Sequence, residues 1–238
     1  MGEWLASPLG RASGIIAVGA RAASDYAARF PEVRVWNIPY HCELKRFRDQ
    51  PARPGISREL TFLFCGQMIR RKGVDLVVAA FVQMLAEGVK ARLVLIGRPD
   101  REGEAVLAEV PKPCLDRIEK VGFIQPEKLP EWFAQADVFV LPSRREGWGV
   151  VVNQAAAAGL PLIVSDAVEA GQEWLKPGEN GWRVEAGHMD SLTAAMREAV
   201  KDREQLAKMG KISAALALTR GPEAGAAKLR AALDEVLK

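Results

Sequence analysis

Residues 146–149 read Glu-Gly-Trp-Gly, and their types suit the binding of a phosphorylated sugar. They lie between an apolar run, 137–141, that predicts a buried strand and an alanine-rich run, 150–158, that predicts a helix. The unpaired amides at a helix start favour an anion, and glycine lets a ligand approach the backbone. A carboxylate beside those amides repels phosphate, so Glu146 is better suited to accept hydrogen bonds from hydroxyl groups. Phosphate and hydroxyl groups at one helix start indicate a sugar phosphate.

A second glycine loop, residues 66–73, joins the apolar run 60–65 to a helical pattern at 74–87. Gly66 allows close approach of a ligand to the backbone, and Lys72 supplies a point charge for a phosphate. The loop matches neither G-x-x-x-x-G-K-[ST] nor G-x-G-x-x-G, which argues against a P-loop and against a dinucleotide fingerprint.

Four arginines flank the two loops. They add positive charge beside the predicted phosphate site, and the alternative is that they form a solvated surface. These arginines are Arg70, Arg71, Arg144 and Arg145.

The elements that must position these loops alternate between strand and helix. Strands joined by helices imply right-handed crossovers and a parallel sheet with both faces covered. In such sheets ligands bind beyond the carboxyl ends of the strands, where both glycine loops fall. The predicted fold is therefore an α/β, Rossmann-like, doubly wound parallel sheet. Predicted strands are 14–18, 33–38, 60–65, 92–96, 118–122, 137–141, 160–164 and 181–184; predicted helices are 21–29, 74–87, 129–134, 150–158 and a tail from 189, interrupted near 219–222.

Composition narrows the functional class. The 238 residues are 49% hydrophobic, enough for a full core, and the net charge of +3 is far below that of most nucleic-acid binders. Three widely spaced cysteines without a C-x-x-C pair favour a reducing compartment. No apolar run approaches the roughly 18–20 residues of a membrane helix, and no signal peptide is visible. We expect a cytoplasmic protein with possible peripheral contact at the inner membrane face.

The ordered set of motifs resembles the family-4 (group 1) glycosyltransferases, retaining enzymes of the two-lobed GT-B fold. The resemblance runs from about residue 60 to residue 192 and covers the family's C-terminal, donor-binding lobe. It is carried by residues 64–67, 72–75, 93–97, 136–143, 146–149, 153–161, 165–166 and 178–181.

The resemblance implies two catalytic residues, Lys72 and Glu146. Lys72 would stabilise the departing diphosphate, and Glu146 would accept hydrogen bonds from the hydroxyls of the donor sugar. The amides of residues 147–149 would face the sugar and the diphosphate. The donor-binding residues implied in this way are Gly66, Gln67, Gly97, Phe123, Ile124, Gly147, Trp148, Gly149 and Gln154.

Two of these positions depart from the family pattern. Gln154 stands where the family usually has a carboxylate that holds both ribose hydroxyls, and a neutral amide accepts less strongly. The loss of binding free energy is about 1–2 kcal/mol, which corresponds to roughly tenfold weaker binding of the nucleotide-sugar. Gln67 stands where an arginine is common, which leaves the diphosphate to Lys72 alone or with help from Arg70.

The nucleotide base and metal ions raise separate expectations. Phe123 and Ile124 are expected to contact the base, the alternative being that Phe123 belongs to the core. Asp166 is interpreted as a cap at a strand end. His41 and His188 do not form a metal site, and the sequence has no Asp-x-Asp pair, so we expect neither a metal ion nor a cofactor.

The resemblance also suggests a division of the chain. Residues 1–41 would be a remnant of the N-terminal acceptor lobe, 42–59 a linker, 60–215 the nucleotide-sugar-binding lobe and 216–238 a C-terminal helix. Since the acceptor lobe would be incomplete, we expect that the chain is a fragment and that activity requires the missing part.

The expected function is transfer of a hexose from a UDP- or GDP-linked sugar to a glycan or lipid-linked acceptor, with retention and without a metal ion. The alternative, motivated by Gln67 and Gln154, is a degenerate nucleotide-sugar-binding module without turnover. A third hypothesis, an NAD enzyme, lacks its fingerprint.

Overall fold

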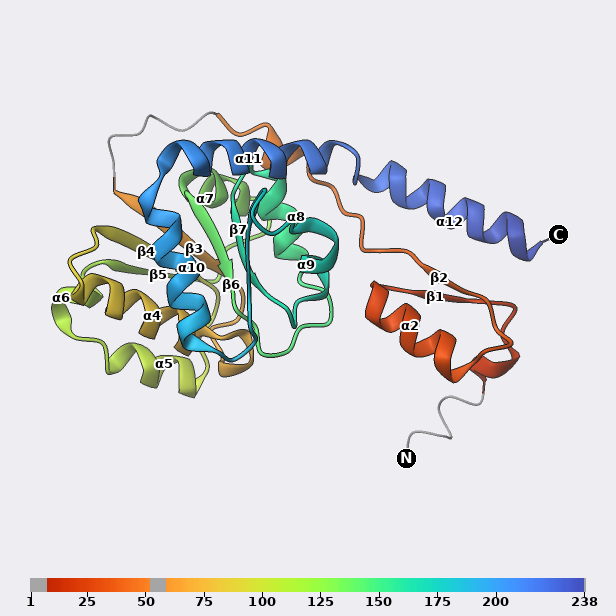
Figure 1. Ribbon diagram of the computed structural model, residues 1–238, viewed down its shortest axis with the longest axis horizontal. Helices are drawn as coiled ribbons and strands as arrows, with labels where there is room; N and C mark the ends of the chain where they lie inside the picture. The colour runs from red at the N-terminus through yellow and green to blue at the C-terminus, as the bar shows by residue number, and fades with distance from the viewer. Residues whose placement is uncertain (1–7, 52–58, 238) are drawn as a thin grey trace. The chain divides into compact units, whose positions relative to one another are not determined.

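The computed structural model describes residues 8–51 and 59–237 (Figure 1). The chain divides into two compact units, each treated by itself. The described parts of residues 1–43 and 219–238 form the smaller unit, and residues 44–218 form the larger one apart from the gap.

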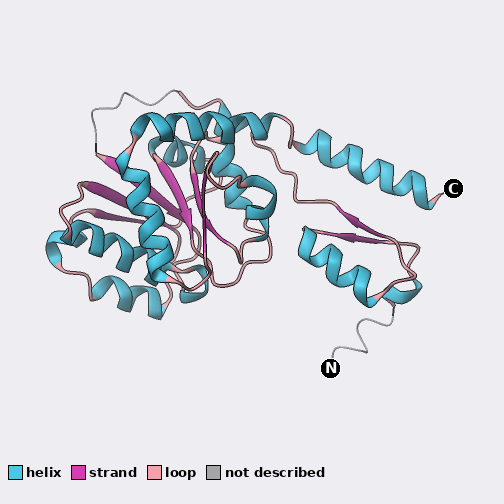
Figure 2. Cartoon of the chain, in the orientation of Figure 1, coloured by secondary structure: helices cyan, strands magenta, loops and turns pink. Residues whose placement is uncertain are grey.

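The larger unit contains a six-stranded parallel sheet, whose strands are magenta in Figure 2. The strand order is β5-β4-β3-β6-β7-β8. The order reverses between β3 and β6, which is the switch point where doubly wound sheets bind ligands. The strands are β3 (Leu60–Cys65), β4 (Ala91–Ile96), β5 (Ile118–Gly122), β6 (Val138–Leu141), β7 (Leu162–Ser165) and β8 (Gly181–Val184).

The central strands are apolar throughout because helices cover both of their faces. All six residues of β3 and all four of β6 and β7 are buried, without the alternation of a half-exposed strand. Helix α4 packs against α5 and α10, and α8 packs against α9 and α11. The helices of this unit are α3 (Lys45–Arg48), η2 (Arg70–Lys72), α4 (Val74–Ala86), α5 (Arg101–Ala108), α6 (Lys112–Leu115), α7 (Leu129–Gln135), α8 (Val150–Ala157), α9 (Glu169–Trp174), α10 (Met189–Lys201) and α11 (Arg203–Leu218).

The smaller unit pairs β1 (Ile15–Ala17) with β2 (Val35–Asn37) in parallel, connected by α2 (Ala20–Arg29). Two further helices belong to it, η1 (Leu9–Arg11) and α12 (Pro222–Val236). Trp36 Nε1 donates a hydrogen bond to Glu235 Oε2 at 3.0 Å, which ties β2 to α12.

The predicted α/β parallel sheet is confirmed, and every predicted strand is present with ends shifted by at most a few residues. The stretch interpreted as a linker contains α3, whose Phe47 is buried and packs edge-on against Phe133 at 5.2 Å between ring centroids. Within the described ranges, no helix has the length and apolar character needed to cross a membrane.

Candidate functional site

Three neighbouring strands, β3, β4 and β5, end in glycines that bring their backbones together. A Cβ atom on Gly97 would lie 1.8 Å from the carbonyl oxygen of Gly66, so only glycine fits there. Gly97 also has φ of +140°, a conformation that other residues rarely adopt. Its amide donates to Gly122 O at 2.8 Å, and the Gly66 amide donates to Ile96 O at 2.9 Å. The strand ends therefore form one continuous backbone rim.

The two predicted glycine loops lie side by side at this rim. A Cβ atom on Gly73, at the end of the first loop, would lie 2.4 Å from the carbonyl oxygen of Pro142 in the second. The amide of Arg144 donates to Arg71 O at 2.8 Å, and Arg71 Nη1 donates to Arg145 O at 3.0 Å. These contacts hold residues 66–73 against residues 142–149.

Lys72 and Glu146 meet where the loops touch. The Lys72 ammonium donates to Glu146 Oε2 in an ion pair, and only 15% and 11% of the two side chains are exposed. Charges removed from water to this degree need a partner, and each supplies one for the other. The two sequence-predicted catalytic residues thus share one charged centre.

The start of α8 is shaped by its glycines and by a buried tryptophan. Gly149 caps the helix with φ of +94°, and a Cβ atom there would lie 2.8 Å from Val168 Cγ1. The Trp148 side chain is 5% exposed and donates from Nε1 to Asn153 Oδ1 at 3.2 Å. Trp148 therefore anchors the loop through its ring, which leaves only its backbone for a ligand. Gly147 is exposed, and a Cβ atom there would meet nothing within 4 Å.

The two glutamine departures differ in their surroundings. Gln67 is exposed on the first loop. Gln154, one turn into α8, has a buried Oε1 that accepts no hydrogen bond. A buried carbonyl oxygen without a donor is unfavourable by about 1–3 kcal/mol, so this atom suits a ligand that brings a donor.

Phe123, just beyond β5, is 55% exposed, and the alternative that it belongs to the core is wrong. The Arg98 guanidinium carbon lies 5.0 Å from the centre of its ring, within the range of a cation–π contact. One face of the ring is thus occupied by Arg98. Ile124 beside it is half-buried.

Arg144 does not belong to a solvated surface. It donates from Nη1 to Asp75 Oδ1 and from Nη2 to Asp75 Oδ2, both at 2.7 Å. Arg70, Arg71 and Arg145 are exposed, as the surface interpretation expects. Asp75 belongs to the segment 72–75 that carries the family resemblance, but no role is predicted for its side chain, which lies in the first turn of α4.

Two further residues complete the surroundings. Asp166 Oδ1 accepts a hydrogen bond from the Ala186 amide at 3.0 Å, which is the kind of contact that a cap at a strand end makes. Burial raises the pKa of the Cys65 thiol to about 12, against the opposing effect of the positive charge on Lys72. Cys65 ends β3, whose six residues are all buried.

Comparison with known proteins identifies this arrangement. The family described as "Glycosyl transferases group 1" matches residues 46–215, which include all of the site residues described in this subsection. The chain belongs to this glycosyltransferase family.

A curated relative is the GDP-mannose-dependent alpha-(1-6)-phosphatidylinositol monomannoside mannosyltransferase of Mycobacterium tuberculosis. It is 28% identical over 211 residues, which are 81% of this chain and 54% of the relative. The chain thus spans about half the length of the curated relatives it matches.

Solved structures confirm the GT-B fold. Sucrose-phosphate synthase from Thermosynechococcus elongatus has a TM-score of 0.81 at 26% identity. The match covers 97% of this chain and 60% of the synthase chain. The pneumococcal O-GlcNAc transferase GtfA, solved with UDP and GlcNAc, has a TM-score of 0.79 at 18% identity. It covers 99% of this chain, which spans 47% of GtfA. One of these similar proteins is thus GDP-mannose-dependent, and another was solved with UDP and GlcNAc.

Proposed function

We propose that this chain carries the donor site of a retaining hexosyltransferase that uses a UDP- or GDP-sugar and acts on a glycan or lipid-linked acceptor without a metal ion. The single observation that carries the proposal is the contact between Lys72 and Glu146 at the rim of the sheet. One cation for a diphosphate and one carboxylate for sugar hydroxyls lie together at the start of α8.

On binding of the nucleotide-sugar, Lys72 and Glu146 would each give up the other as a partner and contact the ligand. The diphosphate oxygens would take the Lys72 ammonium and the amides of residues 147–149, and the sugar hydroxyls would donate to Glu146. Charge on the leaving diphosphate grows as the sugar–phosphate bond breaks, so a fixed cation there stabilises the transition state more than the ground state.

The nucleoside would lie toward β5 and α8. The base would pack on the open face of Phe123 beside Ile124, since aromatic rings stack on bases of any type. The buried, unpaired Oε1 of Gln154 would accept one ribose hydroxyl. The relative that mannosylates a phosphatidylinositol mannoside supports a lipid-linked acceptor and peripheral contact with a membrane.

Calorimetric titration of the full chain with UDP, GDP, uridine and guanosine tests the donor site. Lys72→Met is expected to weaken nucleoside diphosphate binding by about 10–100-fold, because a charge-assisted hydrogen bond is lost. Nucleoside binding should be unchanged. Lys120→Met, which removes an exposed lysine paired with Glu104, is the matched control and should change neither.

Glu146→Gln separates the two roles further. It releases Lys72 from its ion pair, so UDP or GDP should bind at least as tightly as in the wild type, while the added affinity for a sugar nucleotide is lost. Absence of binding by both diphosphates at millimolar concentration would refute the donor site. Binding without any sugar transfer, in a chain joined to an acceptor lobe, would favour the non-catalytic module.

A further inference from the structure

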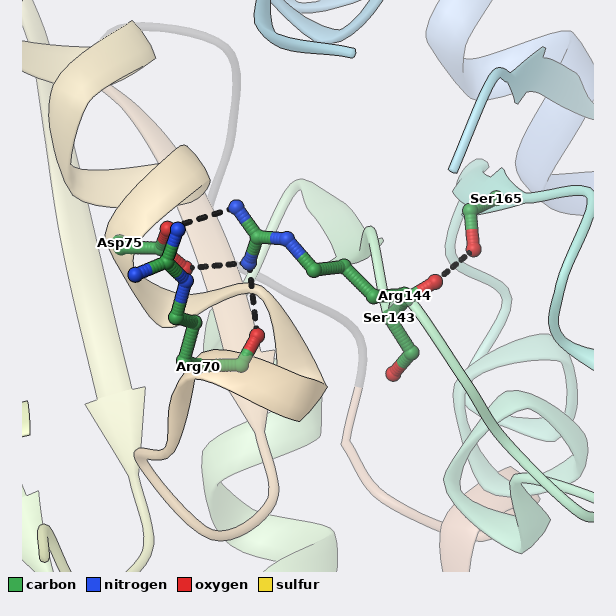
Figure 3. A network of polar contacts seen from close by, with 5 residues as sticks. All are labelled: Arg70, Asp75, Ser143, Arg144 and Ser165. Atoms are coloured by element: carbon green, nitrogen blue, oxygen red, sulfur yellow. Dashed lines mark hydrogen bonds and ion pairs between the residues drawn. The ribbon is translucent and has the colours of Figure 1, made fainter. Parts of the chain in front are cut away.

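Arg144 and Asp75 link the two loops through a contact that lies outside the ion pair of Lys72 and Glu146. Arg144 lies two residues before Glu146, and Asp75 lies three residues after Lys72. Both carboxylate oxygens of Asp75 receive an N–H of Arg144 at 2.7 Å, which is the fork geometry of a bidentate pair. Figure 3 shows the guanidinium reaching from its loop to the first turn of α4.

The same guanidinium also holds the backbone of the first loop. Arg144 Nη1 donates to Arg70 O at 2.7 Å, and the Arg144 amide donates to Arg71 O at 2.8 Å. Arg70 O additionally accepts from the Gly73 amide at 3.0 Å, so the turn that carries Lys72 is fixed at both ends. An incoming phosphate would have to displace these bonds to reach the guanidinium.

The other side of Arg144 is anchored to the sheet. Ser165 Oγ, at the end of β7, donates to Ser143 O at 2.6 Å (Figure 3). Both serines are fully or almost fully buried. Residues 143 and 144, joined by a peptide bond, are therefore hydrogen-bonded to β7 on one side and to α4 on the other.

We propose that Arg144 and Asp75 form a strut that sets the separation between Lys72 and Glu146. Arg144 is then a positioning residue, and its charge is matched by Asp75 and not by a ligand. The effect on donor binding rests on the proposed function, whereas the coupling of the two loops does not. A displacement of about 1 Å in such a site lowers activity by as much as a hundredfold, which gives the strut its importance.

A double-mutant cycle on the full chain tests the strut by amide hydrogen exchange. Arg144→Met and Asp75→Asn are each expected to lower the protection of the Gly73 and residue-144 amides by about tenfold. The double variant should be no less protected than the single variants. Losses that multiply would show that the two residues act independently and would overturn the proposal.

Two further variants separate geometry from charge. Arg144→Lys keeps the charge but cannot bridge both carboxylate oxygens while holding Arg70 O, so its exchange should resemble that of Arg144→Met. If Arg144→Lys kept the amide protection of the wild type, the bidentate geometry of Arg144 would not be required and the proposal would be overturned. Arg145→Met removes a neighbouring exposed arginine and should leave amide exchange in both loops unchanged. If Arg145→Met lost as much amide protection as Arg144→Met, the effect would come from the lost positive charge and not from the contact with Asp75.

UDP and GDP titrations extend the test to the site. Arg144→Met should weaken binding of the preferred diphosphate about tenfold beyond the change in Arg145→Met, with uridine and guanosine unaffected. An equal change in both variants would count against positioning. If the wild type binds neither diphosphate, the proposed function fails, while the exchange cycle still decides whether the strut exists.

Discussion

Gln154 offers a hydrogen-bond acceptor that the folded chain does not use. Its Oε1 is buried without a donor, one turn from the loop that carries Glu146. A carboxylate at the same place would accept from two hydroxyls with charge-assisted bonds, whereas the amide oxygen accepts less strongly. In the proposed donor site, the glutamine would therefore hold a ribose less tightly than a carboxylate would.

Gln154→Glu is expected to tighten binding of UDP or GDP by about tenfold, which is the difference between a neutral and a charge-assisted acceptor. Isothermal titration measures the change. Gln83→Glu is a matched control, because Gln83 Oε1 is also buried without a partner but lies in α4. Equal gains in both variants, or a loss in Gln154→Glu, would contradict a ribose contact.

Ionisation of Cys65 is expected to make the free energy of unfolding depend on pH. Its folded pKa is raised to about 12 from 9.0, so the thiol stays neutral in the folded chain while it ionises in the unfolded chain. The unfolded state then binds fewer protons between these two values. Stability is expected to fall by about 1.4 kcal/mol per pH unit from pH 9 toward 12 through this group alone.

The difference between wild type and Cys65→Ala in urea unfolding, measured at several pH values, isolates this effect from other titrating groups. At pH 8, iodoacetamide should modify the half-exposed Cys114 and leave Cys65 unmodified until the chain unfolds. Rapid modification of Cys65 in the folded chain would show that the thiol is not buried as described.

The sequence predicts some site residues but not the contacts between them. The types and order of the glycine loops were enough to choose Lys72 and Glu146, because both follow strands whose ends meet at one edge. The partnership of Arg144 with Asp75 was not predictable, since four arginines flank the loops and nothing local distinguishes one. Only the folded backbone selects which guanidinium faces a carboxylate.

At the scale of elements, the backbone contact between Gly66 and Gly97 sets how closely β3 and β4 end together. The contact needs both the absence of a side chain and a positive φ at Gly97. Gly122, at the end of β5, also has positive φ, +77°, but a Cβ atom there would meet nothing within 4 Å. Substitution of Gly97 would therefore cause both a steric clash and backbone strain, whereas substitution of Gly122 would cause backbone strain alone.

Gly97→Ala is expected to lower the free energy of unfolding by about 2–4 kcal/mol, the sum of overpacking and left-handed strain. Gly122→Ala should lower it by about 1–2 kcal/mol, from strain alone. Chemical denaturation of both variants checks the ranking. Equal losses would indicate that the close approach of Gly66 and Gly97 contributes little.

Strands were easier to predict than short helices. Uniformly apolar runs such as 60–65 mark buried parallel strands, and long helices show a clear apolar period. In contrast, α5 buries only Gly103 and Leu107, and the six-residue α9 has Gly171 at its centre. Neither carries enough periodic apolar residues to stand out, so both were missed.

At the scale of the whole molecule, every proposed donor-site residue belongs to the larger unit, residues 44–218. That unit has its own six-stranded sheet and its own buried core. All residues named for the proposed donor site therefore come from one compact unit. Transfer to an acceptor is a separate requirement, and the division of the chain into lobes stays a prediction.

Residues 44–218 expressed alone should unfold cooperatively and bind UDP or GDP within about threefold of the full chain, because the site and its supporting strands are retained. Circular dichroism during heating and calorimetric titration measure the two properties. A folded fragment without nucleotide affinity would place an essential contact in the smaller unit.

The ion pair of Lys72 and Glu146 has a consequence for the kinetics of association. Because Lys72 and Glu146 cancel each other's charge and Asp75 neutralises Arg144, these four side chains together attract a distant anion only weakly. Long-range attraction falls instead to the exposed Arg70, Arg71 and Arg145, whose fields are screened by salt over about 10 Å at 0.1 M. Added salt should therefore slow the capture of a diphosphate more than it shortens the residence time of the bound one.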